Sequence, residues 1–379
     1  MARAEGHLRC QRYAIGRSLS LSCSAHRSQP IRAPAFDPRI APAASLRGFA
    51  PSYSLVPPAT ESAISLFLLK RLATFVATLL AASALIFAML DILPGNAAEV
   101  MLGATATPEA VQALTVKLGL DRPPLERYGL WMKGLATGDL GISVSYDTPI
   151  APLIIERLAV TLPLALMAMA LTTVLALGLG LYAASHHNRP GDVGVMTASQ
   201  IGLAIPNFWF AILLILLFAV KLQWFSAGGF PGWDDGIWNA FKALVLPAVA
   251  LAVVQAAILA RITRSAVLDV MREDFVRTAR AKGLSRRAVL WRHVLRNAFV
   301  PVLTVMGLQF ASLLAGTIVA ENVFSLPGLG RLVFQAIANR DLGVVRNVVM
   351  LLAASVIVIN FLVDVLYVVV DPRLKTSHG

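Results

Sequence analysis

The chain has 379 residues, of which 57% are hydrophobic and 14% charged, and its formal net charge is +12. Soluble globular domains carry about 25% charged residues, so this composition excludes an ordinary soluble enzyme and indicates a membrane protein. The two cysteines, Cys10 and Cys23, both lie in the amino-terminal tail. They cannot supply a disulfide framework or a thiolate metal site to the remaining chain, and we expect neither a metal nor a cofactor in it.

Residues 1–62 form a tail that is rich in Arg, Ser, Pro and Ala and contains three acidic residues. It shows no hydrophobic period, so we expect it to be disordered. Its composition resembles an organelle transit peptide. We favour the alternative that the tail is dispensable or that translation begins near Ala63.

Six apolar segments follow, each long enough to cross the hydrocarbon core of a bilayer. The sequence therefore predicts an all-α, polytopic membrane protein with six transmembrane helices. The segments comprise residues 72–93, 158–184, 195–220, 243–260, 302–319 and 348–370.

The basic residues are distributed unevenly among the loops. Ten of the 33 Lys and Arg lie in residues 261–296, whereas residues 94–157 carry five basic and seven acidic residues. Cytoplasmic loops are enriched in Lys and Arg, so we place residues 261–300 inside, residues 94–157 outside and both termini in the cytoplasm. Because the basic residues cluster in the way expected of cytoplasmic loops, the net charge does not by itself indicate nucleic acid. We expect membrane lipid around the chain and no nucleic acid as a partner.

These segments divide the chain into four regions. Residues 1–62 are the tail, residues 63–157 hold the first transmembrane helix and an exoplasmic cap, residues 158–373 are a five-helix core, and residues 374–379 are a short tail. In the cap, a capping Thr107 followed by Pro108 predicts a helix to residue 118. A second, amphipathic helix is expected over residues 125–135, followed by a turn at 138–143.

Several positions within the apolar segments stand out. Pro206-Asn207 lies near the middle of the third segment, where proline bends a helix and frees a carbonyl, so we expect a hinge or a cavity-lining point. Asp364 should pair with an arginine or reach interfacial water, since an isolated carboxylate at the bilayer centre costs about 2.5–3.5 kcal/mol. Gln255 and Gln309 are either interhelical hydrogen-bond partners or pathway residues.

Two loops carry further signals. His186 and His187 lie in a turn between the second and third spans without neighbouring cysteines or a carboxylate cluster, so we interpret them as polar loop residues. Residues 321–347 are rich in glycine, with a proline among them, which predicts a packed and partly re-entrant segment.

The basic loop has the layout of a docking element. A short helix should end at a Gly283–Ser285 break, and Ser285 should cap a second helix. Ten basic residues exceed what topology requires, so we favour docking of a partner protein. The expected contact residues comprise an apolar anchor of Phe275 and Val276, the cations Arg277, Arg280 and Lys282 that would meet acidic groups, the small Ala279 and Ala281 with Thr278 between the cations, and the turn-forming Gly283.

The same loop resembles the cytoplasmic coupling loop of ABC importer permeases, in particular the dipeptide/oligopeptide/nickel branch. The resemblance covers roughly residues 63–373. Its motifs are Arg-Thr-Ala-Arg-Ala-Lys-Gly-Leu-Ser at 277–285, Arg-His-Val-Leu-Arg-Asn-Ala at 292–298, Val-Pro-Val-Leu-Thr at 300–304, Glu-Asn-Val-Phe-Ser-Leu-Pro-Gly-Leu-Gly-Arg at 321–331, Asn-Arg-Asp at 339–341, Asp364, Asp-Pro-Arg at 371–373, Leu-Pro-Gly-Asn at 93–96 and Gly-Asp-Leu-Gly-Ile-Ser at 138–143. The chain departs from the branch at Leu342 and Gly343, where an aromatic residue and a proline are expected.

The resemblance implies a type I importer fold in the bacterial inner membrane. Its partners would be a homologous second permease, two cytoplasmic ABC ATPase subunits that dock on residues 275–283, and an exoplasmic solute-binding protein. The chain has no Gly-x-x-x-x-Gly-Lys-Ser/Thr loop, so ATP would be hydrolysed by the partner subunits and the chain itself would not be an enzyme. We expect di- or oligopeptides as cargo. The alternatives are nickel or another solute of the same branch, and, from a different class, an ion-coupled secondary transporter. That class predicts inverted repeats, broken helices and buried carboxylates near the midplane, of which the sequence shows little beyond Pro206.

Overall fold

The structure is a computed structural model that describes residues 61–92, 97–102, 106–117 and 119–370. Within these ranges the regular structure is helical, apart from one isolated β-bridge between Ile142 and Pro149. Four predicted features lie outside the described residues: the tail at residues 1–60, the Leu-Pro-Gly-Asn motif at 93–96, the Asp-Pro-Arg motif at 371–373 and the tail at 374–379.

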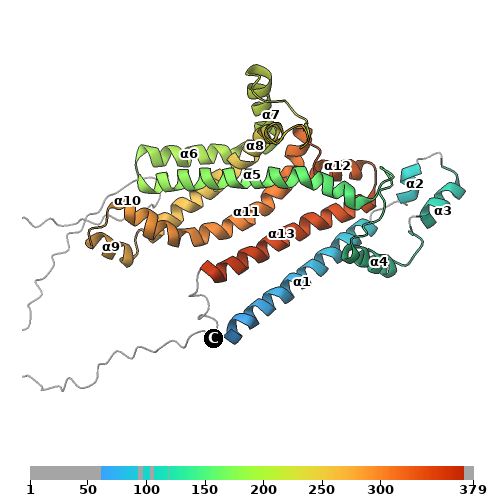
Figure 1. Cartoon of the computed structure of the whole chain (residues 1–379), viewed down its shortest axis with the longest axis horizontal. Helices are drawn as coiled ribbons and strands as arrows, with labels where there is room; N and C mark the ends of the chain where they lie inside the picture. Colours follow the sequence, from blue (N-terminus) through green and yellow to red (C-terminus); the bar gives the residue numbers. More distant parts are fainter. Residues whose placement is uncertain (1–60, 93–96, 103–105, 118, 371–379) are drawn as a thin grey trace, which may run out of the picture. The chain divides into compact units, whose positions relative to one another are not determined.

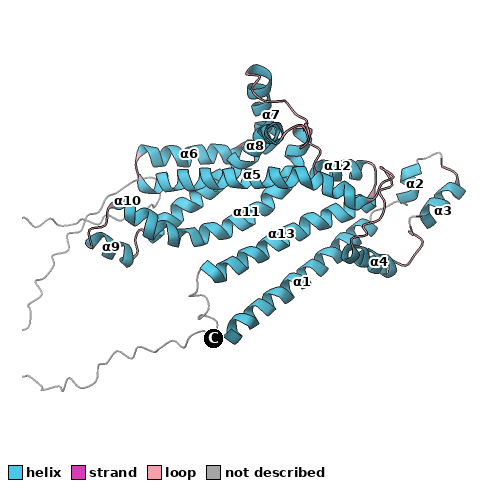
Figure 2. Ribbon diagram, in the orientation of Figure 1, coloured by secondary structure: helices cyan, strands magenta, loops and turns pink. Residues whose placement is uncertain are grey.

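The helical elements follow one another with short connections (Figures 1 and 2). In chain order they are α1 (Glu61–Asp91), α2 (Ala97–Leu102), α3 (Pro108–Lys117), α4 (Pro124–Thr137), α5 (Ile150–Ser185), α6 (Pro190–Ala204), α7 (Asn207–Leu214), the π-helix η1 (Ile215–Lys221), α8 (Ile237–Val270), α9 (Asp274–Ala281), α10 (Arg286–Val289), the π-helix η2 (Leu290–Val294), α11 (Leu295–Val323), α12 (Leu329–Ala338) and α13 (Leu342–Val370).

Five of the described helices are long and apolar enough to cross a membrane, namely Leu69–Asp91, Ile150–Ser185, Ile237–Val270, Arg286–Val323 and Leu342–Leu366. A sixth candidate is a pair of helices, Pro190–Ala204 and Asn207–Lys221, bent by 101° at a short break. The prediction of an all-α protein with six apolar spans is therefore confirmed. The helices are longer than the predicted apolar segments, because the polar residues at the helix ends continue the helical backbone hydrogen bonding.

The third predicted span is broken rather than continuous. Ile205 and Pro206 both adopt extended backbone between α6 and α7. Proline cannot donate a backbone hydrogen bond, and it disfavours helical conformation in the residue before it, which here is Ile205. Helix α6 therefore ends at Ala204. The predicted bend at Pro206 is confirmed, but the single helix expected over residues 195–220 is two helices.

Helix α8 lies at the centre of the bundle, where it contacts α5, α6, α7 and α11. Of its most apolar window 67% is buried inside the chain, against 11% for α1 and for α13, which pack on each other (Figure 1). A Cβ added at Gly180 of α5 would lie 2.7 Å from the carbonyl oxygen of Ala260. The glycine therefore allows the close backbone approach that is typical of helix pairs in membranes.

The cap after α1 is built largely as predicted. The Thr107 hydroxyl accepts a hydrogen bond from the amide of Ala110 at 3.4 Å, and Pro108 opens α3. Helix α4 ends at Gly138, which has φ +79°. An ion pair between Arg127 and Asp91 at 2.6 Å ties α4 to the end of α1.

Candidate functional site

The predicted docking element is residues 271–294, here called the coupling segment, which joins α8 to α11 through α9, α10 and η2. Gly283 has φ +82°, a left-handed conformation that ends α9 and turns the chain. The Ser285 hydroxyl then accepts a hydrogen bond from the amide of Ala288 at 3.3 Å and caps α10. The helix, glycine break and capped helix that the sequence predicts are all present.

The inner face of the coupling segment is buried within the chain itself. Val276 and Val294 are fully buried, and Ala279 and Val289 nearly so. They belong to one apolar cluster with residues of α5, α8 and α11, including Val267 of α8. Because this face packs against the helix bundle, the segment is anchored to the membrane-spanning helices.

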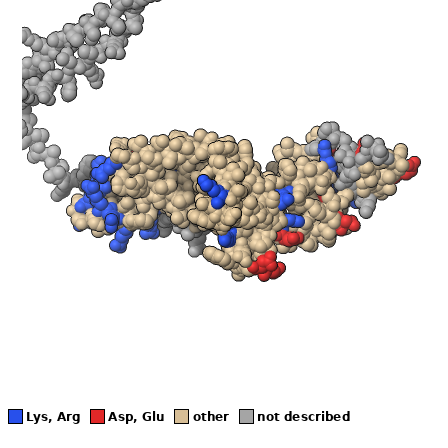
Figure 3. Space-filling model, turned by 90° about the horizontal axis from the view of Figure 1, so that it is seen from above, with Lys and Arg blue, Asp and Glu red and all other residues tan. Residues whose placement is uncertain are grey.

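The outer face is exposed and basic. The side chain of Phe275 is 43% exposed, and the other exposed members of the predicted set are Arg277, Thr278, Arg280, Ala281, Lys282 and Gly283. Figure 3 shows Lys and Arg gathered at the end of the molecule that carries α9 and α10, here called the basic end. This face offers an apolar side chain among cations to an acidic partner.

Two of the predicted contact residues are therefore misassigned. Val276 is expected from the sequence as an anchor and Ala279 as a small residue against a partner, but both face inward and are covered by the chain. Their spacing of three residues places them on one side of a helix, which is the signal that could have shown this. Two exposed apolar residues that the sequence reasoning missed, Leu284 (39% exposed) and Trp291 (62%), lie in the same segment.

Next to the coupling segment, α6 and α8 are joined by an ion pair that the sequence analysis did not find. Arg264 donates from Nη2 to Asp192 Oδ2 at 2.7 Å and from Nε to Oδ1 at 2.5 Å. The Asp192 side chain is 3% exposed and also accepts from the amide of Asn188 at 3.0 Å. The ring nitrogen Nδ1 of His187 lies 3.3 Å from Asp192 Oδ2, so this histidine belongs to the network rather than to a plain polar loop.

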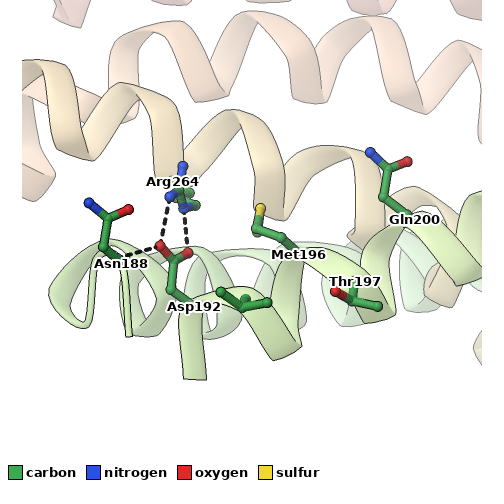
Figure 4. Close-up of a pocket in the computed structure, with 7 residues that line it drawn as sticks. Asn188, Asp192, Met196, Thr197, Gln200 and Arg264 are labelled. Carbon is green, nitrogen blue, oxygen red and sulfur yellow. Dashed lines mark hydrogen bonds and ion pairs between the residues drawn. The ribbon is translucent and has the colours of Figure 1, made fainter. Parts of the chain in front are cut away.

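The pair borders an open pocket of about 290 Å³, shown in Figure 4. Arg264 reaches it from α8, and the remaining lining residues come from the α5–α6 turn and α6, namely Asn188, Asp192, Val193, Met196, Thr197 and Gln200. In the figure Arg264 points at Asp192, and its guanidinium group is held by the carboxylate at the edge of the pocket.

The polar residues predicted within the spans have separate roles. Gln309 of α11 donates from Nε2 to the backbone oxygen of Gln255 in α8 at 3.0 Å, and both residues are buried. Gln309 is therefore an interhelical hydrogen-bond donor. Asp364 pairs with Arg71 at 3.0 Å, which confirms its predicted structural pairing and joins α13 to α1. Pro206 and Asn207 lie at the broken span.

At the other end of the bundle, here called the cap end, the predicted packed segment surrounds α12. Glu321 is fully buried and accepts hydrogen bonds from the amide of Gly330 at 2.7 Å and the hydroxyl of Thr161 at 2.6 Å. Asp341, also fully buried, accepts from the Ser143 hydroxyl at 2.6 Å. These carboxylates tie the segment to α5 and to the loop before it, which confirms that the segment is packed. Its partly re-entrant path stays a prediction.

Comparisons with known proteins agree with this arrangement. Residues 176–376 match the model of the family described as "binding-protein-dependent transport system inner membrane component", and residues 64–165 match the model of its N-terminal region. A putative peptide transport system permease protein of Brucella abortus is 43% identical over 308 residues, which is 81% of this chain and 98% of that protein. The dipeptide transport system permease protein of Alkalihalophilus pseudofirmus is 37% identical over 82% of this chain and 99% of its own.

A di/tripeptide transport system permease protein of Pseudomonas aeruginosa is 38% identical over 82% of this chain and 98% of its own length. A solved structure of the MetNI methionine ABC transporter matches at 20% identity and a TM-score of 0.48, over 58% of this chain and 96% of that one. The two matched regions together include α1 and the cap that follows it, the helix bundle and the coupling segment. The chain therefore belongs to the family of binding-protein-dependent transport system inner membrane components, the multi-pass permeases of ABC importers.

Proposed function

We propose that this chain is the permease subunit of an ATP-driven peptide importer and that its coupling segment receives a separate ATPase subunit. The two faces of α9 carry this proposal. Val276 and Ala279 anchor the helix inside the chain, while Phe275, Arg277 and Arg280 remain on the exposed side. A helix that packs against the bundle on one side and is exposed on the other can transmit a displacement from a partner to the bundle.

In this proposal the partner subunits bind and hydrolyse ATP, and the chain converts their movement into a change of the membrane helices. Closure of the ATPase pair would displace α9, and the buried apolar cluster to which both Val276 and Val267 belong would carry that displacement into α8. The change would be a rigid-body rearrangement between two packed states, in which the pathway opens alternately to the two sides of the membrane.

The remaining partners and the orientation are part of the same proposal. A homologous permease would complete the pathway, and a solute-binding protein would deliver cargo at the cap end. The basic end would face the cytoplasm, because Lys and Arg are enriched in cytoplasmic loops. Pro206, Asn207, Gln255 and Gln309 remain candidates for residues that line or shape the pathway.

Peptide cargo is proposed from the names of the relatives, which are peptide, dipeptide and di/tripeptide permeases. The test is to purify the complete complex with its binding protein and identify the small molecule that the binding protein holds. Mass spectrometry should find di- or oligopeptides. A nickel chelate or another non-peptide solute would overturn the peptide assignment and leave the importer assignment intact.

Docking is tested by charge reversal in the complex of tagged permease co-expressed with its ATPase subunits. The double variant Arg277→Glu/Arg280→Glu should lower the amount of ATPase that co-purifies by about tenfold, since each reversal replaces an attraction with a like-charge repulsion. The matched control is Arg122→Glu, an exposed cation between α3 and α4. Equal recovery of ATPase from the double variant and the control would contradict docking on this face.

A further inference from the structure

Helix α6 is attached to the bundle with little apolar burial. Only Asp192 and Ser199 of its side chains are buried, whereas Val193 and Ile201 are 60% and 58% exposed. Inside a membrane the hydrophobic effect does not drive helices together, because lipid tails are as apolar as the side chains, so close packing and polar contacts specify which helices associate. The buried contact of Asp192 is therefore the most specific attachment of α6 at the basic end.

The geometry of this contact restrains orientation as well as distance. Arg264 uses Nε and Nη2 to hold both carboxylate oxygens of Asp192, as Figure 4 shows. A two-point contact of this kind fixes the relative direction of the two side chains. The amide of Asn188 donates to the same carboxylate from the turn before α6, so the start of α6 is held from both sides.

Arg264 is also close to the coupling segment along its own helix. It lies three residues before Val267, and so on the same side of α8 one turn away. Val267 belongs to the buried cluster that contains Val276 of α9. The ion pair therefore lies next to an apolar cluster that includes residues of both α8 and α9, which places α6, α8 and α9 in one connected region at the basic end.

We propose that the Asp192–Arg264 ion pair is a strut that makes α6 move with α8 and the coupling segment as one rigid unit during the ATPase cycle. The inference rests on the proposed function, since it assumes that the coupling segment is displaced by ATPase subunits. Beyond docking, it assigns Asp192 and Arg264 as positioning residues that carry the movement into the first half of the broken span.

The test measures a distance within this chain in the assembled complex. Spin labels are placed at Val193 of α6 and Trp238 at the far end of α8, which are 60% and 79% exposed, after Cys10 and Cys23 have been replaced by serine. Double electron–electron resonance is recorded without nucleotide and after trapping with ATP and vanadate. A rigid unit predicts that the two states agree to within about 2 Å, the scale of ordinary helix shifts.

Arg264→Ala should then make the distribution about twice as broad or make it differ between the two states, because α6 loses its specific contact. The matched control is Arg261→Ala, which removes an exposed cation one turn earlier on α8 and should leave the distribution unchanged. Arg264→Lys keeps the charge but not the two-point contact and should give an intermediate width, so the test does not depend on the folding of Arg264→Ala alone.

The proposal is overturned if the wild-type distance shifts between the two states by more than about 2 Å, or if both Arg264 variants give the wild-type distribution. Co-purification of the ATPase is measured in the same preparations and reports docking. Both Arg264 variants should retain it. ATPase co-purification with Arg277→Glu/Arg280→Glu therefore tests the proposed docking, and the spin-label distance with the Arg264 variants tests the proposed role of the ion pair. One proposal can fail while the other stands.

Discussion

The coupling segment at the basic end and the segment around α12 at the cap end are held in place by different chemistry. At the basic end the coupling segment is held by apolar side chains such as Val276, while its charges remain outside. At the cap end the connections depend on buried carboxylates, Glu321 and Asp341, that satisfy backbone and hydroxyl donors. Charges on an outer face are available to a partner, whereas buried carboxylates serve the fold. The difference is consistent with the proposal that the coupling segment receives a partner, whereas the segment around α12 requires a fixed backbone path.

The strongest way to break this comparison is to remove the Glu321 carboxylate. Glu321→Ala leaves the amides of Gly330 and Arg331 and the hydroxyl of Thr161 without their acceptor. Unsatisfied buried donors are costly, so we expect a loss of about 3 kcal/mol in unfolding free energy, measured by denaturant unfolding in detergent. Glu126→Ala, at a carboxylate that is 53% exposed, is the matched control. An unchanged midpoint for Glu321→Ala would contradict the role of buried carboxylates.

A second pair of variants separates the two faces of α9. Val276→Ala opens a cavity against the bundle and should cost about 2 kcal/mol of stability. Phe275→Ala should leave stability unchanged and reduce ATPase co-purification, because the Phe275 side chain is already 43% exposed. The same preparations supply both measurements. The assignment of an inner and an outer face fails if Phe275→Ala destabilises the chain as much as Val276→Ala does.

The turn between α9 and α10 gives a third prediction. Gly283 has φ +82°, and the space that a Cβ would occupy there is open, with no neighbouring atom within 4 Å, so the cost of a side chain is conformational rather than steric. Gly283→Val should cost about 1–2 kcal/mol and reduce ATP-driven uptake while membrane insertion is retained. Gly283→Asn is the control, since asparagine tolerates this conformation. Normal uptake by the valine variant would remove the requirement for a sharp turn.

The smallest effect is expected at Asp364. Its ion pair with Arg71 has side chains that are 30% and 42% exposed, and single polar contacts between membrane helices contribute about 0.6 kcal/mol on average. Asp364→Asn should therefore shift the unfolding midpoint only slightly and leave uptake unchanged. A large loss of uptake at normal stability would show that this carboxylate takes part in transport.

Much of the fold could be predicted because its signals are local. The length of apolar runs indicated the spans, Pro206 indicated a bend in the third span, and Gly283 with Ser285 indicated the turn and cap of the coupling segment. Each of these depends on the conformational preferences of one or two residues. The angle of 101° at the broken span was not predictable, since it depends on packing against α8 and α11.

The contacts between distant residues could not be predicted from local patterns. Asp192 and Arg264 are separated by 72 positions. In the sequence, Asp192 resembles an ordinary turn residue, and Arg264 resembles one of the basic residues expected next to a cytoplasmic loop. The inward direction of Val276 and Ala279 was in principle readable from their spacing, but only once α9 was known to pack on the bundle. The sequence thus indicated where the coupling segment lies, and tertiary packing decided which of its residues remain exposed.

The central claim is that an ATPase subunit docks on the outer face of α9. A photo-crosslinking amino acid at Arg280, whose side chain is exposed, tests it most directly in the co-expressed complex. Docking on this face predicts a crosslinked product of the permease with the ATPase at position 280 and none at Arg122 near the cap end. Absence of that product at 280 in an intact, ATP-hydrolysing complex would contradict it.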